Sequence, residues 1–146
     1  IKTLKLNLIE NFFYKNIWYD DYGKSTFSQQ SASFSILTEI NEAKNVNSIL
    51  SDITECSLNE GKKNKMILSS PFMHFYVFLA LEKHDKFQDI IRIIKIKWGY
   101  WAKKKYPTTW ENWNVDFPDG SQCHSFSAHP IYFINQYYEK LQLKNF

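Results

Sequence analysis

The sequence predicts an all-α protein built from antiparallel helical hairpins. Apolar residues recur at helical spacing along most of its 146 residues, and glycine and proline number only 4 each, so the chain is not loop-rich. The predicted helices alternate between amphipathic ones and ones that are apolar on nearly every side, which is typical of paired outer and inner helices. A chain of this length is expected to form one domain with a sizeable core.

A turn-like loop separates the first two predicted helices. The first helix covers Lys2 to Tyr14, where apolar side chains recur at helical spacing. The loop covers residues 16–25. Thr26 and Gln29 fit a capping box, so the second helix is expected to start there and to run to about Glu42.

The middle of the chain predicts two further helices. A short connection near residues 41–45 leads into an amphipathic helix that is expected to end near Cys56. Residues 57–69 are polar and are interpreted as a loop. Ser70 and Pro71 then form a cap and a first-turn proline, which predict the start of a buried, nearly all-apolar helix over residues 72–81.

The last two predicted helices flank a long loop at residues 105–126. Asp85 with Gln88 predicts a capped start for the first of them, and Ser127 is expected to cap the second. One face of the first helix is predicted to carry Phe87, Ile90, Ile91, Ile94, Trp98 and Trp101. The buried stripe of the second is predicted to carry Ile131, Ile134, Tyr138 and Leu141.

The lengths of the connections indicate where function lies. The connections near residues 41–45 and 84–85 are short, whereas those at 16–25, 57–69 and 105–126 are long. In a ring of antiparallel hairpins, all three long loops fall at the N-terminal ends of the inner helices. Long loops on a rigid scaffold are where binding and catalytic residues concentrate.

Composition excludes several classes of function. The net charge is only +3 and the lysine runs at 62–63 and 103–105 are short, so we expect no nucleic-acid binding. Apolar runs fall short of the roughly 18 residues that a membrane helix needs. Cys56 and Cys123 show no metal-ligand spacing and are expected to be buried free thiols, with a disulfide left open. The chain begins with Ile1 rather than with methionine, so the absence of a targeting segment predicts nothing about the cellular compartment.

A carboxylate between two tryptophans is the most informative motif. Glu111 lies between Trp110 and Trp113 in the long loop, and the segment 125–133 follows with further aromatic residues. Sugar-hydrolysing pockets often combine a carboxylate for the water or leaving group with an indole face for the sugar ring. The chain has 5 Trp, 9 Tyr and 12 Phe, more rings than a core of this size needs, so some are expected to line a pocket or an interface.

These residues resemble the C-terminal part of the catalytic domain of bacterial α-L-rhamnosidases, which are six-hairpin (α/α) toroid glycosidases. Residues 108–111 with Trp113 resemble the Thr/Trp/Glu motif of that family, and residues 121–132 resemble the segment that follows it. Supporting matches lie at 27–30, 70–76 and 81–87. The resemblance implies that residues 1–146 form a single partial domain, about half of the toroid.

The resemblance also implies an activity. It is the hydrolysis of terminal α-L-rhamnosides with inversion, without cofactor or metal, and Glu111 corresponds to the general base. The general acid of the family belongs to an acidic cluster upstream of this chain, and Asp20 with Asp21 does not resemble that cluster. The expected partners are therefore an α-L-rhamnose-containing oligosaccharide or glycoside and the remainder of the parent catalytic domain. The isolated fragment is expected to be inactive.

Three histidines are candidates for substrate contacts. His124 precedes the last inner helix, so it is expected either to contact a sugar hydroxyl or to order the loop. His74 lies in the first turn of an inner helix and either points into the pocket or is buried. His129 is a third candidate for the pocket.

The remaining candidates have structural alternatives. Of Trp110 and Trp113, one is expected to pack in the core and the other to meet the sugar. Trp18, near Asp20 and Asp21, shares the functional end of the molecule and is a candidate for the pocket rim. Gln29 is expected to cap its helix rather than to touch substrate. Asp116 and Asp119 belong to a turn, where aspartate is common for backbone reasons.

Two other functions stay open. One is a six-hairpin glycosidase that cleaves a different sugar, and the other is a non-catalytic helical module that binds carbohydrate or a partner protein. The sequence contains no Ser/His/Asp triad, phosphate-binding glycine loop or metal cluster, which disfavours those chemistries. An acidic cluster upstream in the parent sequence would distinguish a hydrolase from a binding module.

Overall fold

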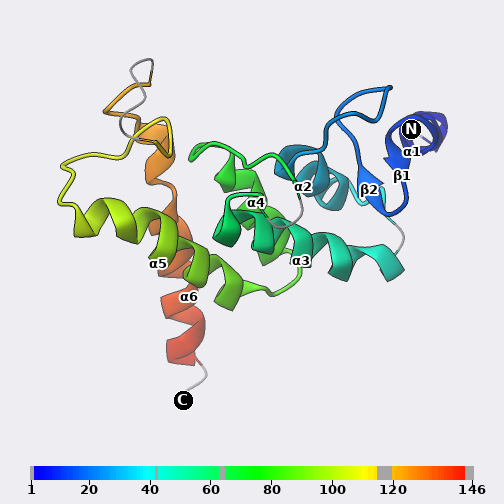
Figure 1. Ribbon diagram of the computed structural model, residues 1–146. Coiled ribbons are helices and arrows are strands. Elements are labelled where there is room, and N and C mark those ends of the chain that lie inside the picture. The colour runs from blue at the N-terminus through cyan, green and yellow to red at the C-terminus, as the bar shows by residue number, and fades with distance from the viewer. Residues whose placement is uncertain (1, 42, 63–64, 115–119, 144–146) are drawn as a thin grey trace. The chain divides into compact units, whose positions relative to one another are not determined.

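The computed structural model describes residues 2–41, 43–62, 65–114 and 120–143, so the predicted turn with Asp116 and Asp119 lies outside the described residues. Six α-helices and one short hairpin form in the described part (Figure 1). Their bounds are α1 Lys2–Phe12, β1 Phe13–Tyr14, β2 Ile17–Trp18, α2 Gln29–Leu37, α3 Ala43–Asn59, α4 His74–Glu82, α5 Phe87–Lys103 and α6 Pro130–Leu143, with a 3-10 turn at Ser125–Ala128. The predicted all-α class is confirmed.

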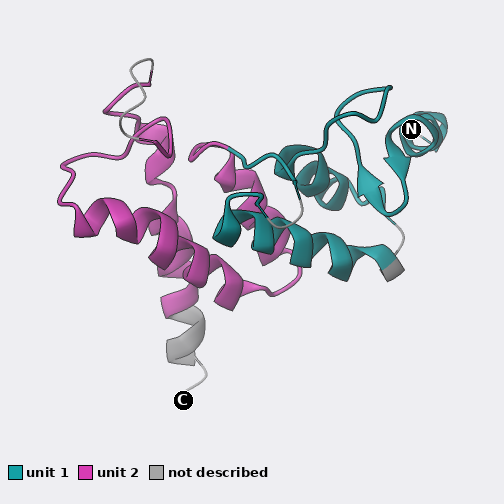
Figure 2. Cartoon of the chain, viewed as in Figure 1, with its two compact units in different colours: residues 1–69 teal, residues 70–146 magenta. Residues whose placement is uncertain are grey.

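The chain divides into two compact units, residues 1–69 and residues 70–146 (Figure 2). The first contains α1, the hairpin, α2 and α3, and the second contains α4, α5 and α6. Each unit has its own buried apolar side chains, which lie mainly on α2 and α3 in the first and on α4 and α5 in the second.

The core of the first unit lies between α2 and α3, which pack on one another. Ile36 of α2 and Ile53 of α3 are almost fully buried there. The side-chain amide of Gln29 is also fully buried. It donates to Ile53 O at 2.7 Å and to Ser57 Oγ at 2.7 Å, and its oxygen accepts from the Ser69 N–H at 2.8 Å. Gln29 therefore ties α2 to α3 and to residue 69.

The predicted capping box at Thr26 and Gln29 is wrong. Helix α2 begins two residues later than expected, with Ser28 as its N-cap, and Ser28 Oγ accepts from the Ser31 N–H at 3.3 Å. Gln29 turns inward instead of back along the helix because α3 offers it buried partners. The loop before α2 meets the loop after α3 at the N-terminus of α2, where Gln29 N donates to Ile67 O and Ile67 N donates to Phe27 O.

A hairpin inside the first predicted loop was not expected. Phe13 pairs with Trp18 and Tyr14 pairs with Ile17 in antiparallel register. The turn between them places Lys15 and Asn16 at positive φ, 49° and 65°. Turns of this kind favour glycine or asparagine at both positions, and lysine gives a weak sequence signal, which explains why the hairpin escaped prediction.

Gly61 follows the C-terminal end of α3. Among the described residues it is the only glycine with a positive φ, 70°. Its N–H donates to Cys56 O, and a Cβ added at this position would lie 2.1 Å from the backbone oxygen of Met66. A backbone atom cannot move aside as a flexible side chain can. Residues 61 and 66 are therefore held in a close approach that only glycine permits.

We expect Gly61→Ala to lower the free energy of unfolding by about 2–3 kcal/mol, because strain at positive φ adds to the backbone clash. Urea unfolding followed by circular dichroism measures the change. Gly99→Ala is the matched control, since a Cβ at Gly99 in α5 would meet Ile94 O at an ordinary 3.8 Å. Alanine there should stabilise the protein by about 0.5–1 kcal/mol. Equal effects of the two substitutions would contradict the argument.

In the second unit, α5 packs on both α4 and α6 (Figure 1). The predicted apolar face of α5 is largely confirmed, because Phe87, Ile90, Ile94, Trp98 and Trp101 are buried. Ile93 and Lys97 join that face, whereas Ile91 is only half-buried.

The predicted helix starts in this unit have mixed outcomes. Ser70 Oγ accepts from the Met73 N–H at 3.3 Å, so Ser70 caps the turn before α4, whereas the helix itself begins later than predicted, at His74, with Met73 at its N-cap. The predicted Asp85 cap is wrong. Asp85 adopts a positive φ of 56° in the turn between α4 and α5, and Lys86 occupies the N-cap position of α5. A residue at positive φ belongs to the turn and cannot start the helix.

The predicted cap and stripe of α6 are both wrong. Ser127 lies inside the 3-10 turn, and α6 starts at Pro130. This start places Pro130 and the fully buried Phe133 inward. The predicted stripe residues Ile131, Ile134 and Tyr138 are 61%, 40% and 61% exposed. The side chain of Leu141 lies outside the described ones.

Both cysteines are free, which agrees with the expectation of thiols. Cys56 is fully buried, and its Sγ lies 3.3 Å from Met66 O. Cys123 is exposed, so the expected burial holds for Cys56 alone.

Candidate functional site

The loop that carries Glu111, residues 104–124, is closed by hydrogen bonds between its two arms. Glu111 N donates to Ser121 O at 2.9 Å, and His124 N donates to Thr109 O at 2.8 Å. Thr109 Oγ1 donates to His124 O at 2.8 Å, and Thr108 Oγ1 donates to Gln122 O. The two arms thus run side by side, and Glu111 on the first arm is paired with Ser121 on the second.

The carboxylate of Glu111 is part of this pairing. Its Oε2 accepts from the Ser121 N–H at 2.9 Å, and the side chain is half-buried. A peptide N–H that donates to a carboxylate fixes its orientation. Glu111 therefore has the restrained position that a base needs, although the same bond also gives it a structural role in the loop.

Trp113 packs into a cluster of aromatic rings. The centroid of its ring lies 4.8 Å from that of Trp98, 5.4 Å from that of Trp101 and 5.0 Å from that of His74. The ammonium of Lys97 lies 5.1 Å from the centroid of the Trp113 ring, close enough for a cation–π interaction. These contacts anchor the arm that bears Glu111 to α4 and α5.

Trp110 lies in different surroundings. Its ring stacks obliquely on Tyr106, with centroids 5.1 Å apart. Its indole N–H is shielded from solvent, and among the described residues no hydrogen-bond acceptor reaches it. A buried indole N–H ordinarily has a partner, so this donor is available to a ligand or to a part of the protein that is not described.

The structure places His74 in the protein interior. The residue is fully buried, and its Nδ1 lies 3.0 Å from Ser70 O. Its ring meets those of Phe78, Trp98 and Trp113 edge to face. Of the two readings that the sequence left open, the buried histidine matches these contacts.

His129 occupies the same aromatic cluster. Its Nε2 lies 2.9 Å from Pro71 O, and its ring packs against Phe78, Trp98 and Phe133. Its Nδ1 is buried and has no partner among the described residues. Burial lowers the pKa of His129 from 6.5 to about 4, with the bond to Pro71 opposing the shift. The imidazole is therefore neutral at physiological pH and links the start of α6 to the turn before α4.

This shift predicts a loss of stability in acid. The unfolded chain takes up a proton on His129 below pH 6.5, whereas the folded chain does so only near pH 4. The free energy of unfolding should be constant above pH 6.5 and should fall by about 2 kcal/mol on going from pH 7.5 to pH 5. Urea titrations at several pH values measure this. His129→Gln keeps a donor for Pro71 O but cannot take up a proton, so the fall in the free energy of unfolding between pH 7.5 and pH 5 should disappear. An unchanged pH dependence in this variant would show that His129 does not cause the fall.

His124 lies on the inner side of the loop. Its ring is half-buried and packs on Phe72, with centroids 6.5 Å apart, and on Phe126, at 5.8 Å. Together with the bond from His124 N to Thr109 O, these contacts match the loop-ordering role, one of the two roles that the sequence left open. Phe72 belongs to the turn before α4, so within this unit the Glu111 loop contacts the N-terminal end of the inner helix, as its length predicted.

Trp18 lies in the other unit, apart from these residues in the chain. It is 7% exposed, and its Nε1 donates to Asn41 Oδ1 at 2.6 Å. Nearby, Asp20 Oδ1 accepts from Ser28 Oγ at 2.7 Å. Asp21 accepts from the N–H and hydroxyl groups of residues 25 and 26, and these bonds lower its pKa to about 2, with the Thr26 N–H as the largest cause. Both carboxylates organise the loop before α2.

Two residues that contribute to the Glu111 region were not predicted. Lys97 is 7% exposed on the inner face of α5, where its ammonium supports Trp113. Its position four residues before Trp101 and seven after Ile90 places it on the apolar stripe, which is the signal that could have found it. Tyr106 stacks on Trp110, and its position just after α5 carries no comparable signal.

No group of three or more histidine, cysteine, aspartate or glutamate side chains in the described residues could hold a metal ion. No helix in the described part is long and apolar enough to cross a membrane.

Sequence comparison and structure comparison give different outcomes. No protein-family model matches the sequence, and no curated protein matches it. The structure is similar to the GH78 family rhamnosidase of Bacillus sp. GL1, with a TM-score of 0.74 and 19% identity over 92% of this chain. It is also similar to a rhamnosidase from Klebsiella oxytoca solved with rhamnose bound, with a TM-score of 0.72 and 20% identity over 93% of this chain.

The fold is that of a rhamnosidase segment. The resemblance inferred from the sequence is thereby confirmed for the fold, an all-α set of hairpins from an (α/α)6 toroid. The chain spans 15% of the length of the Bacillus protein and 27% of the length of the Klebsiella protein.

Proposed function

We propose that this chain is the part of a glycoside hydrolase for terminal α-L-rhamnosides that carries the general base, Glu111. The observation that supports this most directly is the restraint on Glu111. Its carboxylate is oriented by the Ser121 N–H, in a loop that is fastened through Trp113 to α4 and α5. The similarity in fold to two rhamnosidases, one of them with rhamnose bound, supports the choice of sugar.

In this mechanism, Glu111 accepts a proton from the water that attacks the anomeric carbon. A second carboxylic acid on the opposite face of the sugar, roughly 6.5–9.5 Å away, protonates the leaving oxygen, and the configuration inverts. Neither carboxylate of Asp20 and Asp21 is suited to that role, because both hold their own loop together. We therefore assign the acid to the remainder of the catalytic domain, of which residues 1–146 form a single part.

The two tryptophans take different roles in this proposal. Trp113 packs against three rings of the cluster and serves as the anchor of the loop. Trp110, with its shielded N–H and its face partly covered by Tyr106, is the candidate to meet the sugar. His74 and His129 support the aromatic cluster that anchors Trp113, and His124 positions the second arm of the loop.

The test is hydrolysis of an aryl α-L-rhamnoside by the full parent protein, followed by proton NMR of the released sugar. We expect β-rhamnose to appear first, because the attack inverts the anomeric centre. An aryl α-glucoside should be a poor substrate, and the 146-residue chain alone should be inactive because it lacks the acid. Initial release of α-rhamnose, equal rates on both glycosides, or activity of the isolated chain would contradict the proposal.

A further inference from the structure

Lys97 is a charged residue on an apolar helix face. It lies on the buried face of α5, after Ile93 and Ile94 and directly before Trp98, and it is only 7% exposed. Burial of an ammonium costs hydration free energy. A leucine or a methionine would fill this position without that cost, so the presence of a cation here indicates that its charge has a role.

The ammonium of Lys97 lies over the ring of Trp113, 5.1 Å from the ring centroid. Trp98 and Trp101 contact the same ring, with centroids 4.8 and 5.4 Å away, so about one turn of α5 provides all three contacts. The two indoles fill space beside Trp113. The ammonium is attracted to the negative face of the ring, so it favours the orientation in which that face is turned toward α5.

The position of Glu111 depends on two attachments. One is the bond from the Ser121 N–H to its carboxylate, at 2.9 Å. The other is the short stretch of backbone through Asn112 to the ring of Trp113. Because a misplacement of about 1 Å can lower a rate about 100-fold, a small rotation of that ring is enough to move the carboxylate out of line with its water.

We infer that Lys97 is a positioning residue of the glycosidase. Its charge holds the ring of Trp113, and through that ring it places Glu111 against the attacking water. Lys97 takes no part in proton transfer. This inference rests on the function proposed above, since it concerns the reaction in which Glu111 is the base.

The test compares variants of the full parent protein by kcat and KM for an aryl α-L-rhamnoside. Lys97→Met keeps an unbranched side chain of similar length, suited to an apolar face, and removes the charge. We expect it to lower kcat about tenfold and to leave KM within about twofold, because a misplaced base affects the transition state and not substrate binding. Lys97→Arg keeps a cation that can lie over an indole, so it should restore kcat to within about threefold of the original.

A double-mutant cycle with Trp113→Leu separates this effect from every other contact of Lys97. In the Trp113→Leu background, Lys97→Met should cause no further fall in kcat, because the ring through which the charge acts is gone.

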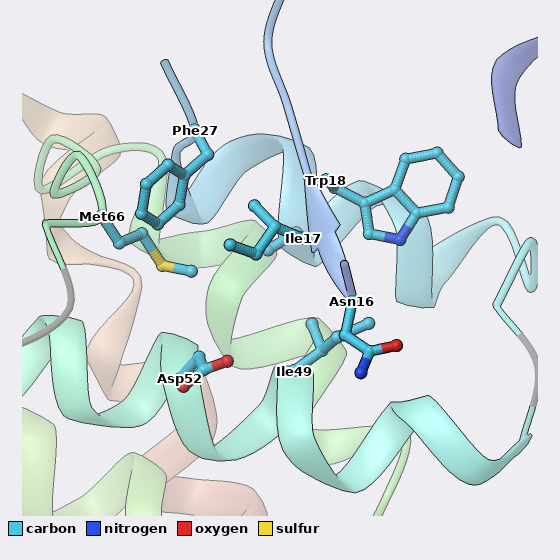
Figure 3. A pocket seen from close by; sticks show the side chains of 8 residues that line it. Asn16, Ile17, Trp18, Phe27, Ile49, Asp52 and Met66 are labelled. Atoms are coloured by element: carbon cyan, nitrogen blue, oxygen red, sulfur yellow. The ribbon is translucent and has the colours of Figure 1, made fainter. Parts of the chain in front are cut away.

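Two further variants are controls, and both should keep the original kcat. Lys95→Met removes an exposed cation from the same helix. Ile49→Ala shortens a side chain that lines a cavity of about 210 Å³ in the first unit (Figure 3). It should destabilise the fold from a unit that does not contain Trp113.

Four outcomes would overturn the inference. They are an unchanged kcat in Lys97→Met, a kcat of Lys97→Arg as low as that of Lys97→Met, an equal effect of Lys97→Met with and without the Trp113 ring, and an equal fall in Ile49→Ala, which would assign the loss to stability. The proposed function fails on a different result, near-normal turnover of Glu111→Gln. If Glu111→Gln loses turnover and Lys97→Met does not, this inference alone is wrong.

Discussion

In the full parent protein, Glu111→Gln is expected to lower kcat for an aryl α-L-rhamnoside by about 10²–10⁴-fold, with little change in KM. Glutamine cannot take a proton from the attacking water at working pH. Its side-chain oxygen can still accept from the Ser121 N–H, which in the original protein lies 2.9 Å from the carboxylate. The variant therefore removes the base and keeps the loop.

The structural role of Glu111 makes a matched comparison necessary. Glu111→Ala removes both the base and the bond to Ser121, so it should lose activity and also some thermal stability. Glu82→Gln, at the C-terminal end of α4, is the control carboxylate and should keep both. Near-normal turnover of Glu111→Gln would show that the carboxylate only holds the loop, and the base would then have to be sought elsewhere.

Most helices of this chain could be predicted from the sequence because their signals are local. The apolar stripe of α5 and the Ser70 cap depend on spacings of three or four residues, and both are found in the structure. The start of α6 depends on the 3-10 turn at residues 125–128, which has no periodic signal. Helix α6 starts two residues later than a Ser127 cap would place it, and it buries Phe133 instead of the predicted stripe.

The Glu111 region could be located from the sequence, but the sequence could not show which of its aromatic side chains pack in the interior. The motif and the long loop identified Glu111, Trp110 and Trp113 together, yet which tryptophan packs depends on the rings of α4 and α5. His74 and His129 lie near inner-helix starts, where a buried and a pocket-facing histidine have the same sequence pattern. Tertiary packing distinguishes these positions: both rings contact Trp98, but His74 is fully buried and His129 is half-buried.

Gln29→Ala should destabilise the first unit by about 4 kcal/mol. The substitution deletes three buried hydrogen bonds, to Ile53 O, to Ser57 Oγ and from the Ser69 N–H. Each buried group that loses its bond to the amide costs about 1–3 kcal/mol. Urea unfolding measures the change, and the half-buried neighbour Gln30→Ala, expected within about 0.5 kcal/mol of the original, is the control. A glutamine that merely capped α2 would cost about 1 kcal/mol at most, so a small effect would restore the capping role that the sequence suggested.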